Sequence, residues 1–159
     1  MKTVFVLFGL LMVCLPALSK SLCNSEEKLV FSCELDKKNV SVCLTRNGSV
    51  EYVYGSEGKV ELALDSPVFS RATCAGGGIS RLRFQDGNVS YIVYDVMCQS
   101  QQISENQWSK ADVAGQMILN KGKLVANKVC KNFDDNVFGI NSAILPENVE
   151  KERFNYDLP

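Results

Sequence analysis

Six cysteines are the residues of this chain with the most clearly defined chemistry. The sequence has seven cysteines, and one of them, Cys14, lies in an apolar segment near the N-terminus. The other six are Cys23, Cys33, Cys43, Cys74, Cys98 and Cys130. A structural zinc site would normally show close Cys-x-x-Cys pairs or histidines, and the sequence contains neither. An even number of widely spaced cysteines instead predicts up to three disulfides formed in an oxidising compartment.

The sequence contains no histidine. It therefore lacks the commonest general base, the usual serine and cysteine triads, and the usual zinc and copper ligands. The remaining hydrolytic chemistry is a carboxylate pair of the glycosidase type, for which Asp65, Asp95 and Glu105 are candidates. Their spacing selects no pair, so we expect a protein that is not an enzyme and that needs no metal or cofactor.

A run of small residues follows Cys74 in the segment CAGGGISR. A phosphate-binding loop would place such glycines between a strand and a helix, but here a strand pattern follows. We interpret the glycines as slack beside a disulfide, or as a binding loop whose backbone a partner can approach closely. The next strand carries two arginines on one face, which are candidate donors to a partner's carboxylates. The candidate partner-binding residues are Ala75, Gly76, Gly77, Gly78, Ser80, Arg81, Arg83 and Tyr94.

Residues 1–19 have the pattern of a secretory signal peptide. A basic residue precedes the apolar run 4–15, and the segment ends in ALS, a small-x-small cleavage site. The run is shorter than the roughly 20 residues that a membrane-spanning helix needs. No small residue directly precedes Cys14 or Cys23, which makes lipidation the less favoured alternative. We expect cleavage near Lys20 and a soluble chain that is periplasmic or secreted.

Residues 20–159 predict a single β domain. Strand patterns cover residues 29–35, 40–45, 50–55, 59–65, 79–84, 89–96, 115–120 and 123–130. Short strands separated by frequent turns predict an all-β fold, either an antiparallel β-sandwich or a small barrel, with about eight strands. We expect residues 99–110 to form a polar loop, and residues 131–159 to form an irregular tail packed on or extending from the domain. The formal net charge of −1 and the lack of a basic patch argue against nucleic acid as a partner.

The expected strand register predicts one disulfide directly. With Asp86 and Gly87 as the turn of a hairpin, Cys74 falls one residue out of step with Cys98. Glycines can absorb such an offset through a bulge or a turn. We therefore predict a bridge between Cys74 and Cys98 that closes the open end of this hairpin.

The other four cysteines have less defined partners. Cys33 and Cys43 are expected on opposite faces of the first hairpin, and should not bond to each other. Among the 15 possible connectivities of six cysteines, we therefore favour Cys23–Cys33 and Cys43–Cys130.

Three stretches, FSCELDKKNVSVC, YVYGSEGKVELAL and GGGISRLRFQDGNVSYIVYD, resemble shared blocks of a family of small, exported, uncharacterised proteins of Gram-negative bacteria. The resemblance covers residues 22–130 and implies a periplasmic location. The chain is also similar in expected topology to the periplasmic inhibitors of C-type lysozyme, small disulfide-containing β-barrels in which a small-residue loop enters the enzyme's cleft. CAGGGISR would correspond to that loop, with WSK at 108–110 and Cys130 after it.

These observations predict a non-enzymatic periplasmic binding protein. Its expected role is that of an inhibitor or immunity protein against a cell-wall-degrading enzyme, either a lysozyme or a secreted toxin. The alternative is a structural or envelope-assembly module that acts through a sheet edge or through self-association into a homo-oligomer.

Overall fold

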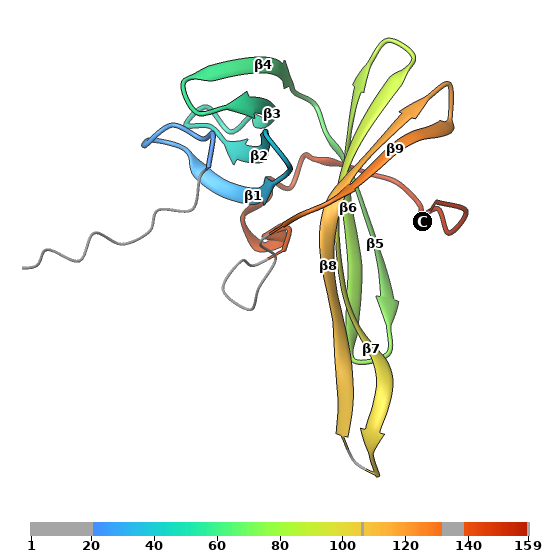
Figure 1. Ribbon diagram of the computed structural model, residues 1–159. Coiled ribbons are helices and arrows are strands. Elements are labelled where there is room, and N and C mark those ends of the chain that lie inside the picture. The colour runs from blue at the N-terminus through green and yellow to red at the C-terminus, as the bar shows by residue number, and fades with distance from the viewer. Residues whose placement is uncertain (1–20, 106, 132–138, 159) are drawn as a thin grey trace, which may run out of the picture.

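The computed structural model describes residues 21–105, 107–131 and 139–158, which form two β-sheets and no α-helix (Figure 1). The expected signal peptide, residues 1–19, lies outside the described residues. The smaller sheet has the order β1-β2-β3-β4. Its strands are β1 (Lys28–Glu34), β2 (Asn39–Leu44), β3 (Val50–Ser56) and β4 (Lys59–Leu64). The larger sheet has the order β10-β5-β6-β7-β8-β9. Its strands are β5 (Val68–Cys74), β6 (Gly77–Asp86), β7 (Val89–Ser104), β8 (Gln107–Asn120), β9 (Lys123–Val129) and β10 (Glu150–Lys151).

The prediction of an all-β, antiparallel fold is confirmed, and of its two alternatives, sandwich and barrel, the structure has two separate sheets. Every strand pair is antiparallel except β10 with β5. Neither sheet closes into a barrel within the described residues, and these residues form ten strands rather than about eight. In the same part of the chain, no helix has the length and apolar character needed to cross a membrane.

Apolar side chains from the two sheets share one core. Val40 and Val42 alternate along β2 and are fully buried, as alternation predicts for one face of a strand. They belong to the same cluster as Leu82 and Phe84 of β6, so the smaller sheet packs on one face of the larger sheet (Figure 1). Each such buried side chain contributes about 1.5–3 kcal/mol relative to its exposed state.

The β6–β7 hairpin has the predicted faces but not the predicted turn. Asp86 pairs with Val89, so Gly87 and Asn88 form the turn instead of Asp86 and Gly87. As a result Phe84 lies opposite Tyr91, whereas a turn at Asp86 and Gly87 would have placed it opposite Val89. The difference is two residues, and because side chains alternate with a period of two, each one stays on its predicted face.

Residues 99–110, which we expected to form a polar loop, instead extend two strands. Gln99 pairs with Lys110 and Ser104 pairs with Gln107, so β7 and β8 continue as a hairpin arm beyond the rest of the sheet (Figure 1). We call residues 99–105 and 107–110 the β7–β8 arm. None of its described side chains, at 99–105, 107 and 109, is buried, and its sequence lacks the alternation of apolar and polar residues that marks other strands. Strand β5 also has no counterpart among the predicted strands.

The three disulfides are Cys74–Cys98, Cys23–Cys43 and Cys33–Cys130. The first confirms its prediction, whereas the predicted pairs Cys23–Cys33 and Cys43–Cys130 are wrong. Cys33 faces the shared core, where Cys130 also lies. Cys43 lies on the other face of β2, where the N-terminal segment crosses and the Leu22 amide donates to the Ser41 hydroxyl at 2.9 Å.

The C-terminal tail, residues 139–158, packs on the domain. The Asn141 amide donates to the Val30 carbonyl at 2.9 Å, and a single 3-10 turn, η1 (Ser142–Ile144), follows. The tail then adds β10 alongside β5 and ends on the face of the larger sheet opposite the smaller sheet (Figure 1). There Leu158 contacts a second apolar cluster, formed by Ile92, Tyr94, Met117 and Leu119.

Candidate functional site

The glycine-rich segment forms the tight turn between β5 and β6. Cys74 pairs with Gly77, which leaves Ala75 and Gly76 as the two turn residues. Gly76 has a φ of +70°, a conformation that favours glycine. A Cβ at Gly77 would lie 1.7 Å from the Met97 carbonyl oxygen of β7. These two glycines are therefore required by the backbone and are more than slack.

The Cys74–Cys98 disulfide fixes this turn to β7. The two Cα atoms are 5.8 Å apart, and the Gln99 amide donates to the Ala75 carbonyl at 2.8 Å. Residues 75–77 are exposed to solvent. We call residues 74–77 with this disulfide the stapled tip. It combines an exposed backbone with a fixed conformation.

The other candidate residues on this strand pair lie within the sheet rather than at its end. Gly78, Ser80 and Arg81 are buried. Tyr94 is also buried on the opposite face from the main core, and its hydroxyl donates to the Asn127 side-chain oxygen at 3.0 Å. Burial raises the pKa of the Tyr94 hydroxyl, so it stays protonated near neutral pH. The structure therefore brings only part of the candidate set together on an exposed surface.

Arg81 binds the chain's own tail. Its guanidinium donates to the Asn155 carbonyl at 2.7 Å and to the Leu158 carbonyl at 3.1 Å. It also lies 4.2 Å from the centroid of the Phe154 ring, a favourable cation–π distance. Only 6% of Arg81 is exposed, and burial lowers the pKa of its guanidinium.

Arg83 also faces the tail. Its guanidinium donates to both carboxylate oxygens of Glu152, at 2.6 and 3.2 Å. This hydrogen bonding raises the pKa of Arg83. The two arginines expected to meet a partner's carboxylates thus contact a carboxylate and carbonyls of this chain. Glu152 is visible in the sequence as an acidic residue, but it lies 69 positions from Arg83. A local sequence pattern cannot pair residues that far apart.

The β7–β8 arm is a surface that the sequence analysis missed. Its strand β7 continues directly from Cys98, so the arm adjoins the stapled tip. Ile103 is 64% exposed, and Met97, just before the disulfide, is 44% exposed. The Ser100 and Ser109 hydroxyls are hydrogen-bonded across the arm at 2.8 Å. Among the arm side chains that the structure describes, residues 99–105, 107 and 109, none belongs to either apolar cluster, so these side chains are available to a partner.

The three candidate catalytic carboxylates lie on separate elements. Asp65 is exposed in the link between β4 and β5, and Glu105 is exposed at the end of the arm. Asp95 is only 1% exposed and accepts hydrogen bonds from the Ser80 amide at 3.2 Å and the Ile140 amide at 2.5 Å. Burial raises the pKa of Asp95, and these hydrogen bonds oppose the shift. Its contacts give Asp95 a structural role, which is to hold the start of the tail against the sheet.

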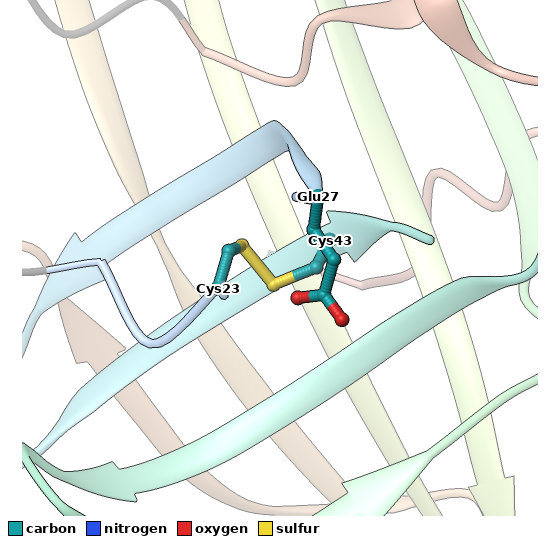
Figure 2. A group of neighbouring side chains, drawn as sticks. All are labelled: Cys23, Glu27 and Cys43. Atoms are coloured by element: carbon teal, nitrogen blue, oxygen red, sulfur yellow. A yellow bond between two sulfur atoms is a disulfide. The ribbon is translucent and has the colours of Figure 1, made fainter. Parts of the chain in front are cut away.

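One cluster of potential metal ligands is present in the described residues. Figure 2 shows Cys23, Glu27 and Cys43 close together. Both sulfur atoms are joined in a disulfide, so neither is the thiolate that a metal needs. The Glu27 carboxylate instead accepts a hydrogen bond from the Asn24 amide at 2.8 Å. This cluster therefore has a structural role, in which the disulfide holds the N-terminal segment against β2.

No family model, curated protein or solved structure matches the chain.

Proposed function

We propose that this protein is an exported, non-enzymatic protein that binds another protein through the stapled tip and the adjoining β7–β8 arm. The stapled tip carries this proposal, because it is an exposed two-residue turn held by a disulfide and by the close approach of Gly77 to β7. A preorganised turn loses little conformational entropy on binding. Small side chains at Ala75 and Gly76 let a partner reach the backbone.

Within this class, we favour an inhibitor or immunity protein that acts in the periplasm against a cell-wall-degrading enzyme, either a lysozyme or a secreted toxin. A narrow tip without charged side chains is suited to entering an active-site cleft and blocking it by shape. The three disulfides indicate an extracytoplasmic protein, which supports the periplasmic location. Because Arg81 and Arg83 bind the tail, we propose that the partner is bound by the backbone of the stapled tip and by the arm.

Inhibition assays test this proposal. Oxidised protein would be added to C-type lysozyme and to secreted bacterial muramidases, and the clearing of a cell-wall suspension would be followed. Ala75→Trp places a bulky side chain on the tip, and Val60→Trp does so at an exposed position of β4 as a matched control. We expect the wild type and the control to inhibit alike and Ala75→Trp to inhibit at least about tenfold less. Equal inhibition by both variants would exclude the tip, and no inhibition of any muramidase would exclude this class of partner.

The edge strand β9 supports a second candidate function, a structural or envelope-assembly module that acts by self-association. Val125 and Val129 are 60% and 56% exposed on this strand. Strand β9 lies at one edge of the larger sheet in the described part of the chain, and such edges can pair with a strand of another molecule. Light scattering separates the two functions. A dimer that dissociates on Val125→Lys substitution would favour assembly, and a monomer at all concentrations would exclude it.

A further inference from the structure

A concave surface separate from the stapled tip lies between the two sheets. This cleft of about 380 Å³ is lined by Tyr52 and Tyr54 of β3, Glu61 and Leu62 of β4, Tyr91 of β7, Gln116 and Ile118 of β8, and Lys128 of β9. We call it the tyrosine cleft. Its volume lies in the lower part of the range of about 300–1,000 Å³ that is typical of small-molecule sites. Tyr91 lies near the β6–β7 turn, whereas the tip disulfide joins β7 towards its other end, at Cys98.

The polar groups of the cleft include a buried pair. The Gln116 amide nitrogen donates to the Tyr52 hydroxyl at 2.5 Å, and the two residues are 2% and 0% exposed. The Gln116 side-chain carbonyl can still accept a hydrogen bond, and Gln116 is the member of the pair that keeps some exposure. Buried polar groups cost free energy unless their hydrogen bonds are made. A ligand hydroxyl can supply this hydrogen bond to Gln116.

Aromatic and aliphatic side chains form the walls. The Tyr52 and Tyr91 ring centroids are 5.7 Å apart, with the rings tilted by 41°. Tyr54 and Tyr91 are half-buried, so part of each side chain is accessible. Tyrosine offers an apolar ring face for contact with C–H groups and a hydroxyl at its end for hydrogen bonding.

The charges of the cleft favour a neutral ligand. It has one carboxylate, Glu61, and one ammonium group, Lys128. Lys38 contacts Glu61 at 2.5 Å, and this hydrogen bond lowers the pKa of Glu61, which therefore stays ionised. A ligand of either sign would meet a like charge. A hydrocarbon chain would offer no hydrogen bond to the Gln116 side-chain carbonyl, which is the part of the amide that does not bond to Tyr52.

We infer that the tyrosine cleft is a binding site for a neutral carbohydrate. One sugar ring packs its C–H face against Tyr54 and Tyr91, and its hydroxyls bond to Gln116, Glu61 and Lys128. The lining residues come from five strands and surround the ligand on several sides. That arrangement suits a ring with hydroxyls around its whole edge better than a planar base with one hydrogen-bonding edge. This activity is independent of the function proposed for the stapled tip.

Titration of isotope-labelled oxidised protein with chitotriose and maltotriose tests the inference. We expect at least one trisaccharide to shift the backbone amide signals of Gln116 and Ile118 in a saturable way. Tyr54→Ala should weaken binding about tenfold because a stacking face is lost, and Tyr54→Phe, which keeps the ring, should bind nearly as well as the wild type. Lys128→Ala should weaken binding measurably. Lys123→Ala, exposed on the same strand but outside the cleft, is the matched control.

Three results would overturn the carbohydrate site. The first is that neither sugar shifts signals from the cleft. The second is that Lys128→Ala and Lys123→Ala bind equally, which would place any sugar elsewhere. The third is that decanoate or benzoate, used as apolar and anionic probes, saturates the cleft while the sugars do not. The amide spectrum of each variant shows whether it is folded. If Tyr54→Ala does not fold, Lys128→Ala still tests the cleft at an exposed position.

Discussion

The three disulfides should stabilise the fold to different extents, because they close loops of different length. Cys33 and Cys130 are 97 positions apart, whereas the partners in the other two bonds are separated by 24 and 20 positions. In the chain-entropy model, closing these loops contributes about 4.7, 3.5 and 3.3 kcal/mol respectively at 25 °C. Cys33 also belongs to the main core cluster, so its truncation adds a loss of packing. We therefore expect removal of the Cys33–Cys130 bond to cost the most, by about 1 kcal/mol or more.

The measurement uses three double variants, each with one bonded pair replaced by alanine and the other two bonds intact. Urea unfolding gives the free energy of unfolding of each, and peptide mapping without reduction confirms the remaining bonds. The entropy argument would be refuted if the Cys33→Ala, Cys130→Ala variant were as stable as the Cys74→Ala, Cys98→Ala variant. A wild-type peptide joining Cys23 to Cys33 would contradict the connectivity itself.

Three further substitutions test the tip, the tail and the buried carboxylate. Gly77→Ala would place a Cβ 1.7 Å from the Met97 carbonyl oxygen, so we expect a loss on the order of 2 kcal/mol or more; an unchanged thermal midpoint would contradict the close approach. Arg81→Ala removes the guanidinium that binds the tail, and should destabilise the protein by about 2–4 kcal/mol. It should also speed proteolysis of the tail. If the tail were cleaved at the same rate in the wild type and in the variant, other residues would hold it. Burial raises the pKa of Asp95 in the folded state, so the folded state binds this proton more tightly than the unfolded state. Lowering the pH through the folded pKa towards the unfolded value should therefore stabilise the wild type relative to Asp95→Asn. Urea unfolding at neutral pH and near pH 4 measures the difference, and the opposite trend would refute it.

The sequence predicted those features that depend on neighbouring residues. Leu82 and Phe84 alternate with Arg81 and Arg83, and the two pairs do lie on opposite faces of the larger sheet. The Cys74–Cys98 bond was predictable for the same reason, since both cysteines lie close to one hairpin. Turn position was less certain because QDGN allows two placements of a two-residue turn, and both preserve the faces.

Features that depend on distant segments could not be predicted in this way. Cys33 and Cys43 were correctly placed on opposite faces, but which face meets Cys130 depends on how the sheets pack. The partners of Arg81 lie 74 and 77 positions away, in a tail without a strong pattern of its own. The β7–β8 arm was missed because backbone hydrogen bonds hold its strands together, and such bonds place little constraint on side-chain type.

The tail also explains why the candidate site divides into an exposed and a buried part. Arg81 remains a buried cation because two carbonyls and the Phe154 ring replace the water that it would otherwise bind. A partner could use this arginine only by displacing the tail, and would have to compensate for all of these contacts. The smaller sheet lies on one face of the larger sheet and the tail on the other, and the β7–β8 arm extends from one end (Figure 1). The stapled tip adjoins the arm, whereas Tyr91 of the tyrosine cleft lies near the β6–β7 turn. If both proposals hold, saturating the cleft with a trisaccharide should leave inhibition through the tip unchanged, because no described side chain belongs to both sites.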